Sequence, residues 1–130
     1  MKAIILSNGE LQVKEIENSL ETLQKIVGGY IEIPFLSKVL QQNNIDVIIN
    51  DEGKFIEGLT PKMVITDTET KETLDIVYGN CIFVSHNDDG ETIGLNNEQI
   101  KVIKEELKYN AILTSKEDEE KQYLVKVLFV

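Results

Sequence analysis

The chain contains no arginine and no tryptophan, and it has a single cysteine, Cys81, and a single histidine, His86. One cysteine excludes an intramolecular disulfide, and Cys81 and His86 alone cannot supply the four ligands of a structural zinc site. Without arginine, no guanidinium can clamp a phosphate through two parallel hydrogen bonds, so lysine is the only strongly basic side chain. The sequence therefore predicts no metal site and no cofactor.

Long apolar runs are also missing. A membrane-spanning helix needs about 18 apolar residues, and no stretch of the sequence approaches that length. The apolar run near the start, residues 3–6, is too short for the hydrophobic part of a secretory signal. Together with the lone cysteine, these absences predict a protein of the reducing cytoplasm.

Positive charge is scarce. Against 13 lysines stand 23 aspartates and glutamates, which gives a formal net charge of −10 and a pI near 4.5. This balance repels the phosphates of nucleic acids and of anionic lipids, so neither nucleic acid nor a membrane surface is expected as a partner. The other proportions, 42% hydrophobic and 28% charged residues in 130 positions, are typical of one globular domain.

Short apolar runs separated by turn residues predict a sheet built from hairpins. Asn8-Gly9 suits a type I′ turn between strands over residues 3–6 and 11–16. Two further hairpins are predicted, one joining residues 45–50 to 54–56 through a turn at Gly53, the other joining 111–113 to 122–130 through the charged segment SKEDEEK. Single strands are expected over residues 30–33, 63–66, 74–78 and 81–84.

Two helices are predicted among these strands. The first covers residues 20–27, with Ser19 as its N-cap and Gly28-Gly29 as its terminator. The second begins after Asn96, where Gln99 three positions later completes a capping box. Residues 36–44 are compatible with either a helical turn or a loop. The order of elements predicts an α+β fold, an antiparallel or mixed sheet with two helices packed on one face.

His86 is the only histidine in the chain, and Asp88 and Asp89 close to it in the sequence could orient it as a general base. A solvated turn is the favoured explanation of this segment, since no serine or cysteine occupies a recognisable nucleophile motif. Paired carboxylates such as Asp51-Glu52 lack the alternating oxygen ligands of a Ca²⁺ loop. The sequence therefore predicts a binding protein that is not an enzyme.

Aromatic rings and lysines could together hold a nucleotide, the rings by stacking and the lysines by charge. Each has a simpler explanation, because an aromatic residue in a strand usually belongs to the core and a lysine in a turn usually faces water. The candidates are Tyr30, Phe55, Tyr78, Phe83, Lys54 and Lys62.

The acidic charge suggests a different function, in which the surface imitates the phosphate row of DNA and blocks a DNA-binding defence enzyme of the host. Lysines are interspersed among the acids, however, and only EDEE, residues 117–120, forms a dense acidic block. This hypothesis therefore ranks second.

Four segments in a fixed order resemble a domain family found in phages and Firmicute mobile elements. They are LETLQKIVGGYIEI (20–33), NDEGKFIEGL (50–59), DIVYGNCIFV (75–84) and DDGETIGLNNEQI (88–100). Within or near that family, the sequence is similar to the Thoeris anti-defence proteins of phages. Those proteins bind a cyclic ADP-ribose isomer made by a bacterial TIR enzyme and hold it without cleaving it.

The resemblance implies a phage protein that acts in the host cytoplasm and sequesters a cyclic nucleotide signal, either a cyclic ADP-ribose isomer or a cyclic oligonucleotide. It also implies a homo-oligomer, a dimer or a dimer-based hexamer, with ligand pockets shared between protomers. It covers about the first hundred residues. Residues 1–108 are thus expected to form the ligand-binding domain, and residues 109–130 a C-terminal β-hairpin extension of it.

Five site residues follow from the resemblance combined with the candidates above. Phe83 is expected to stack on adenine, Lys62 to pair with the pyrophosphate, and Asn96 to contact the base or the ribose. Tyr30 and Lys54 complete the predicted ligand-binding set. The chain departs from the resemblance in one respect, because it lacks the arginines that grip phosphate in such pockets.

Overall fold

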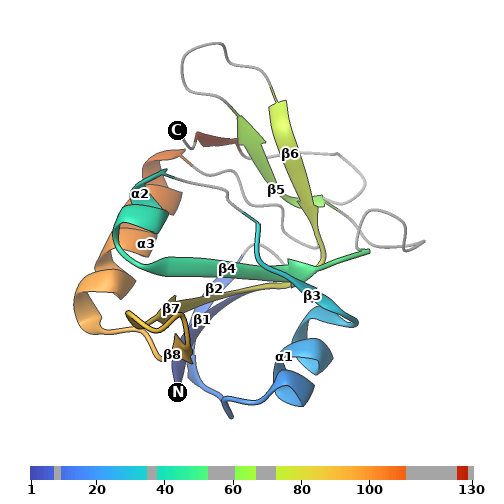
Figure 1. Cartoon of the computed structure of the whole chain (residues 1–130). Coiled ribbons are helices and arrows are strands. Elements are labelled where there is room, and N and C mark those ends of the chain that lie inside the picture. The colour runs from blue at the N-terminus through green and yellow to red at the C-terminus, as the bar shows by residue number, and fades with distance from the viewer. Residues whose placement is uncertain (8–9, 35–37, 53–60, 67–72, 111–125, 129–130) are drawn as a thin grey trace.

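A computed structural model describes residues 1–7, 10–34, 38–52, 61–66, 73–110 and 126–128 (Figure 1). Within these ranges the chain forms three helices: α1 (Leu20–Val27), α2 (Lys38–Gln42) and α3 (Asn97–Asn110). Its strands are β1 (Lys2–Ser7), β2 (Glu10–Glu15), β3 (Ile31–Glu32), β4 (Ile45–Asn50), β5 (Pro61–Thr66), β6 (Thr73–Tyr78), β7 (Cys81–His86), β8 (Thr92–Ile93) and β9 (Lys126–Leu128).

The strands form two sheets. Helices combined with mostly antiparallel sheets confirm the predicted α+β class. The larger sheet has the order β2-β1-β7-β4-β3, with β8 paired to the end of β7, and all of its pairs are antiparallel. Strand β7 lies at its centre, where Phe83 faces Ile4 of β1 on one side and Val47 of β4 on the other. The smaller sheet has the order β6-β5-β9, in which β9 runs parallel to β5.

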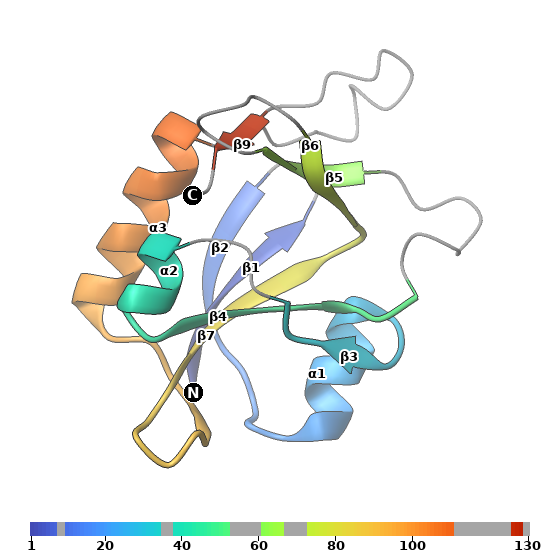
Figure 2. The same ribbon diagram turned by 45° about the horizontal axis from the view of Figure 1, so that its top comes forward.

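Helices cover both faces of the large sheet (Figure 1; Figure 2). On one face, α1 packs Leu23 and Val27 into a core cluster. On the other face, α2 and α3 contribute Leu40 and Ile103 to a second cluster. The expectation of two helices on one face is therefore wrong. The central strands are apolar at successive positions, so both of their faces need cover, as in sheets enclosed between helical layers.

The core clusters follow the alternation of side chains along each strand. Alternate positions point to opposite faces, so each central strand supplies both clusters. The cluster beneath α1 contains Ala3, Ile5, Leu23, Val27, Ile48, Ile82 and Val84. The cluster beneath α2 and α3 contains Ile4, Leu6, Leu40, Ile45, Val47, Cys81, Phe83, Leu95 and Ile103.

The structure confirms the predicted helix termini. The Ser19 hydroxyl accepts a hydrogen bond from the Thr22 backbone N–H (3.2 Å), and Gly28 ends α1 with a φ of 85°. At α3, the Asn96 side chain accepts from the Gln99 N–H (2.8 Å) and the Gln99 side chain accepts from the Asn96 N–H (3.0 Å). The ambiguous segment contains a short helix, α2. Among the described residues, no helix has the length and apolar character needed to cross a membrane.

The three predicted hairpins have different outcomes. The first is confirmed, because β1 and β2 pair with Ser7 opposite Glu10; the turn residues 8–9 lie outside the described ranges. The second hairpin needs residues 54–56, which also lie outside them. For the third, β9 forms inside the predicted strand but pairs with β5, and its predicted partner, residues 111–113, is not among the described residues.

Two of the segments that carry the resemblance, residues 20–33 and the start of residues 50–59, meet at the C-terminal end of α1. The buried Asn50 donates from Nδ2 to the Val27 carbonyl (3.0 Å), and its Oδ1 accepts from the Glu52 N–H (2.8 Å). A Cβ on Gly29 would lie 3.0 Å from Asn50 Nδ2, so glycine at this position lets the amide approach. The two segments also pair directly, Ile31 with Asn50. The contacts of Asn50 with Val27 and Ile31 therefore hold α1, β3 and β4 together.

Replacing Asn50 by alanine is expected to lower the free energy of unfolding by about 1–3 kcal/mol, because a buried carbonyl, that of Val27, loses its donor. Urea denaturation followed by circular dichroism measures the change. Asn43→Ala is a matched control, since the exposed Asn43 amide makes a similar bond to the Val39 carbonyl (2.8 Å) that water can replace. Equal losses in the two variants would contradict the role given to Asn50.

Candidate functional site

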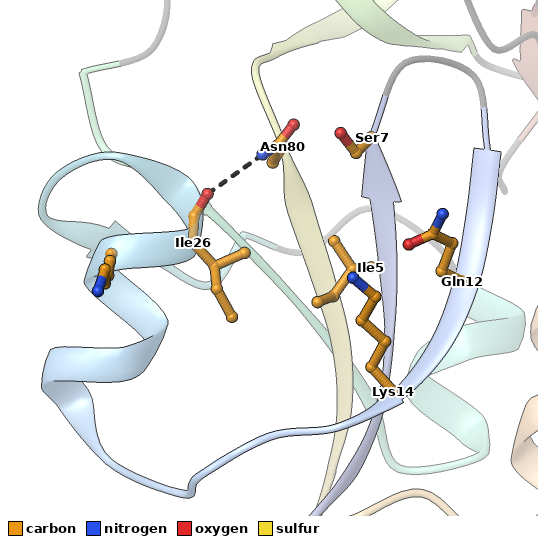
Figure 3. Close-up of a pocket in the computed structure, with 7 residues that line it drawn as sticks. Ile5, Ser7, Gln12, Lys14, Ile26 and Asn80 are labelled. Carbon is orange, nitrogen blue, oxygen red and sulfur yellow. Dashed lines mark hydrogen bonds between the residues drawn. The ribbon is translucent and has the colours of Figure 1, made fainter.

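An open cavity lies between α1 and the neighbouring face of the β1–β2 hairpin (Figure 3). Its volume is about 410 Å³. Cavities that bind small molecules commonly measure about 300–1,000 Å³, so this one is of suitable size. We call it the α1–β2 cavity and define it by its lining residues, which are Ile5, Ser7, Gln12, Lys14, Lys25, Ile26 and Asn80.

The register of the hairpin explains why polar side chains line this cavity. Gln12 faces Ile5 across the β1–β2 pair, and Lys14 faces Ala3, so all four share one face of the sheet. On β1 that face is apolar and belongs to the core beneath α1. On β2 it is polar. The core therefore ends between β1 and β2, and the cavity lies at this boundary.

Asn80 fixes the wall of the cavity next to α1. Its Nδ2 donates to the Ile26 carbonyl (3.3 Å) near the end of the helix. A carbonyl can only accept, so this bond sets the orientation of the whole amide. Figure 3 shows the Asn80 oxygen on the far side from Ile26, toward Ser7. Asn80 thus presents a hydrogen-bond acceptor at this end of the cavity.

The charge of the cavity is opposite to that of the whole chain. The charged side chains that line it are Lys14, from β2, and Lys25, from α1. Within the described part of the chain, neither ammonium group has an ion-pair or hydrogen-bond partner. In a chain with a net charge of −10, the cavity thus has two ammonium groups that contact no carboxylate among the described residues.

The sequence was compared with protein-family models. A model for a domain of unknown function (DUF3846) matches residues 1–108. The chain belongs to this family. Comparisons of the chain with curated proteins and with solved structures gave no match. The DUF3846 match contains all seven residues that line the α1–β2 cavity, and it ends within α3.

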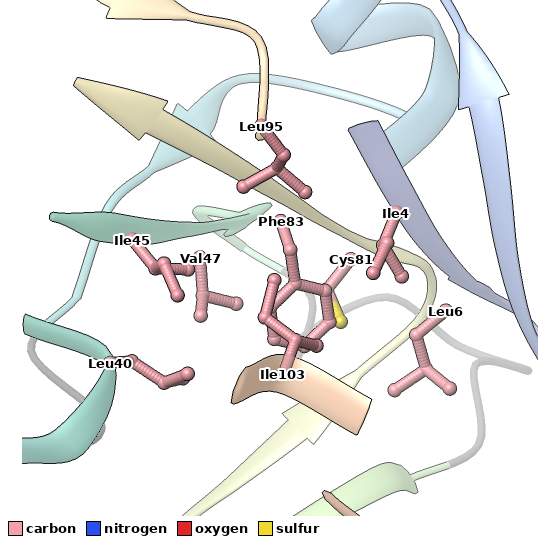
Figure 4. Close-up of a cluster of buried hydrophobic side chains, with 9 residues drawn as sticks. All are labelled: Ile4, Leu6, Leu40, Ile45, Val47, Cys81, Phe83, Leu95 and Ile103. Atoms are coloured by element: carbon pink, nitrogen blue, oxygen red, sulfur yellow. The ribbon is translucent and has the colours of Figure 1, made fainter. Parts of the chain in front are cut away.

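In this DUF3846 domain, Phe83 is a core residue. Its side chain has no exposed surface, and Figure 4 shows its ring among the other members of the cluster, with Ile103 of α3 against it. A ring enclosed in this way has no free face for an adenine. The prediction that Phe83 stacks on a base is therefore corrected, because β7 is buried on both faces and leaves the ring no route to the surface.

The other predicted residues lie apart from the cavity or outside the described side chains. Tyr30 is 73% exposed in the connection from α1 to β3. The Asn96 side chain caps α3. Neither of these two lines the α1–β2 cavity. Lys62 belongs to β5 in the small sheet, where only its backbone is described, and Lys54 lies outside the described residues, so both stay predictions.

The sequence contains one signal for the cavity that motif reasoning missed. In β2, apolar Leu11 and Val13 alternate with polar Gln12 and Lys14, whereas the partner strand β1 is apolar on both faces. A polar face directly beside an apolar one predicts an uncovered boundary. The contribution of Lys25 and Asn80 could not be predicted, because it depends on where α1 docks.

His86 pairs with a different acid from those next to it in sequence. Its Nδ1 lies 3.0 Å from Asp46 Oδ2, with the two side chains 30% and 24% exposed. Asp88 and Asp89 are exposed in the turn between β7 and β8, which confirms the favoured explanation of that segment. The neighbouring Ser85 hydroxyl donates to the Asn44 carbonyl (3.1 Å) and accepts from Gln99 Nε2 (2.8 Å). The His86–Asp46 pair therefore links β7 to β4, with Ser85 engaged elsewhere.

Proposed function

We propose that this DUF3846 domain binds a cyclic nucleotide signal, a cyclic ADP-ribose isomer or a cyclic oligonucleotide, and sequesters it without cleaving it. In this proposal the protein is a phage anti-defence protein of the host cytoplasm, related in function to the Thoeris anti-defence proteins that its sequence resembles. The observation that carries the proposal is the α1–β2 cavity, a small-molecule-sized space whose charged lining is positive.

The electrostatics of the cavity support an anionic ligand. Salt screens charges over about 8 Å at physiological ionic strength, so distant acidic residues act weakly on a ligand that has reached the cavity. Lys14 and Lys25 act at close range, and neither has to leave a protein carboxylate among the described residues in order to bind. The two lysines therefore favour an anionic ligand in the cavity despite the net charge of −10.

A site that only sequesters its ligand requires binding groups and no catalytic groups. It needs charge, hydrogen bonds and apolar contact, with no positioned acid, base or nucleophile. The cavity offers ammonium, amide and hydroxyl groups above the apolar side chains of Ile5 and Ile26. Tyr30, whose ring is exposed, stays a candidate for stacking on a base. Because the cavity is open, we also propose that a second protomer completes it in a dimer or dimer-based hexamer.

A cyclic ADP-ribose isomer is expected to raise the melting temperature of the protein. At a ligand concentration a hundred times the Kd, binding stabilises the native state by about 2.7 kcal/mol. Differential scanning fluorimetry measures the shift, with ribose and sodium chloride as controls. Mass spectrometry of the heated sample is expected to recover the ligand intact. Recovery of a hydrolysed ligand would contradict sequestration and indicate an enzyme.

The second candidate function, imitation of DNA, has a different readout. It predicts a salt-sensitive complex with a host nuclease or methyltransferase and no response to the nucleotide. Its main sequence evidence, residues 117–120, lies outside the described residues. Co-purification of such an enzyme with the protein, lost in high salt, would favour it over the nucleotide.

A further inference from the structure

The α1–β2 cavity is divided into a charged part and a neutral polar part. Figure 3 shows Ser7 and Asn80 together at one end, while the Lys14 side chain starts from the other end and extends toward Ile5. The hairpin register agrees, because Lys14 faces Ala3, four positions along β1 from Ser7. At about 3.4 Å per residue, these strand positions are about 14 Å apart, and the Lys14 side chain extends along part of this distance. A ligand that uses both ends must therefore carry two kinds of group.

The charged part fits a phosphate group. Each ammonium has three donors, and a phosphate offers several acceptor oxygens with negative charge. Lys14 and Lys25 line the cavity from different elements, Lys14 from β2 and Lys25 from α1. Having no acidic partner among the described residues, they give up only water on binding.

The neutral part fits a hydroxyl group. The bond from Asn80 Nδ2 to the Ile26 carbonyl leaves Asn80 Oδ1 as an acceptor, and the Ser7 hydroxyl can donate or accept. Within the described residues, neither group has a protein hydrogen-bond partner in the cavity. A fully ionised phosphate has no proton to donate to Oδ1, whereas a sugar hydroxyl both donates and accepts.

We infer that the α1–β2 cavity takes a phosphorylated sugar, with its phosphate at Lys14 and Lys25 and a sugar hydroxyl at Asn80 and Ser7. Ile5 and Ile26 contact the carbon skeleton between them. This inference rests on the proposed function, since it names the site and the chemical class of the ligand that the domain sequesters.

The test is a titration of ¹⁵N-labelled protein followed by NMR, with ribose 5-phosphate, inorganic phosphate and ribose as three separate probes. Ribose 5-phosphate is expected to shift the backbone amide signals of Ser7, Lys25 and Asn80. Inorganic phosphate is expected to bind more weakly at the same place, and ribose alone more weakly still. This order arises because only ribose 5-phosphate occupies both parts of the cavity.

Substitutions separate the two parts. Lys14→Gln combined with Lys25→Gln is expected to weaken ribose 5-phosphate binding by at least about tenfold, because both charged donors to the phosphate are lost. Ser7→Ala is expected to reduce the preference for ribose 5-phosphate over inorganic phosphate. The matched control is Lys101→Gln combined with Lys104→Gln, which changes the net charge equally on an exposed part of α3.

Several results would overturn the inference. One is the absence of shifts at these residues up to about 10 mM probe, a range that covers Kd values in the millimolar class. Another is an equal loss of binding in the control pair, which would indicate a general effect of charge. If the cyclic ADP-ribose isomer raises the melting temperature while the cavity variants change nothing, the inference fails and the proposed function stands. If ribose 5-phosphate binds as described and the cyclic nucleotide does not, the proposed function fails and the cavity assignment stands.

Discussion

Phe83→Ala is expected to lower the free energy of unfolding by about 3–5 kcal/mol, the usual loss when a buried phenylalanine is truncated to alanine. The ring is fully buried, and its cluster joins β1, β4 and α3 through Ile4, Val47 and Ile103 (Figure 4). Domains of this size have a total stability of about 5–15 kcal/mol, so the variant should be close to unfolding. Urea denaturation with the wild type in parallel measures the loss.

Tyr30→Ala serves as the control for Phe83→Ala. The Tyr30 side chain is 73% exposed, so its truncation is expected to cost less than about 0.5 kcal/mol. Phe83→Leu, which keeps most of the apolar volume, should lose less stability than Phe83→Ala. A Phe83→Ala variant that unfolded like the wild type and lost only nucleotide binding would restore Phe83 to the binding site and contradict its place in the core.

The Cys81 thiol is expected to be at least about a thousandfold less reactive in the native protein than in the unfolded chain, because thiolate is the reactive form. Burial at the centre of the large sheet raises the pKa of Cys81 from its ordinary value of 9.0 to about 12. Reaction with an aromatic disulfide reagent at pH 8, followed by absorbance with and without urea, measures the ratio. Equal rates in the two states would show that β7 is exposed in solution.

The raised pKa of Cys81 also predicts the sign of one pH effect. The unfolded chain releases the thiol proton near pH 9, and the native protein keeps it up to a pKa of about 12. The unfolded state then binds fewer protons, so stability falls as the pH rises through this interval. Below pH 9 the thiol is protonated in both states and adds no pH dependence. Cys81→Ala should therefore show a shallower alkaline loss of stability than the wild type.

Local signals predict much of the fold. The N-cap of α1 at Ser19, the glycine with positive φ at its end, and the reciprocal bonds of Asn96 and Gln99 each involve residues within a few positions of one another. Such interactions are encoded by residue type and spacing, so the sequence reveals them. The first hairpin is predictable for the same reason, since its short connection determines the pairing of its strands.

Long-range pairing is not encoded in this way. The parallel contact of β9 with β5 joins a strand assigned to the third predicted hairpin to a strand that was predicted without a partner. The number of covered faces was predictable in principle, because residues 3–6 and 81–84 are apolar throughout, a pattern typical of strands buried on both sides. The expectation of one covered face ignored this signal. Which helix covers which face depends on packing and cannot be read from either strand alone.

The candidate site was harder to predict than the fold. A search guided by aromatic rings selected Phe83, although its apolar neighbours on β7 indicate a core position. The polar cavity residues are of types that are common on protein surfaces, so residue type alone does not mark them as a site. Lys14 and Lys25 lie on separate elements, and Asn80, directly before β7, donates a hydrogen bond to α1. Only the docking of α1 beside the hairpin brings them together.

The central position of β7 has a consequence for synthesis on the ribosome. The hairpin of β1 and β2 and the strand β4 emerge before β7, yet β7 is the strand that joins them. Until residues 81–86 have emerged from the ribosome, β1 and β4 each lack the strand that pairs between them, and such unpaired edges associate readily with other chains. A pause in translation after β4 has emerged and before β7 has emerged should therefore increase aggregation of the nascent protein, whereas a pause after β7 has emerged should have little effect on the large sheet.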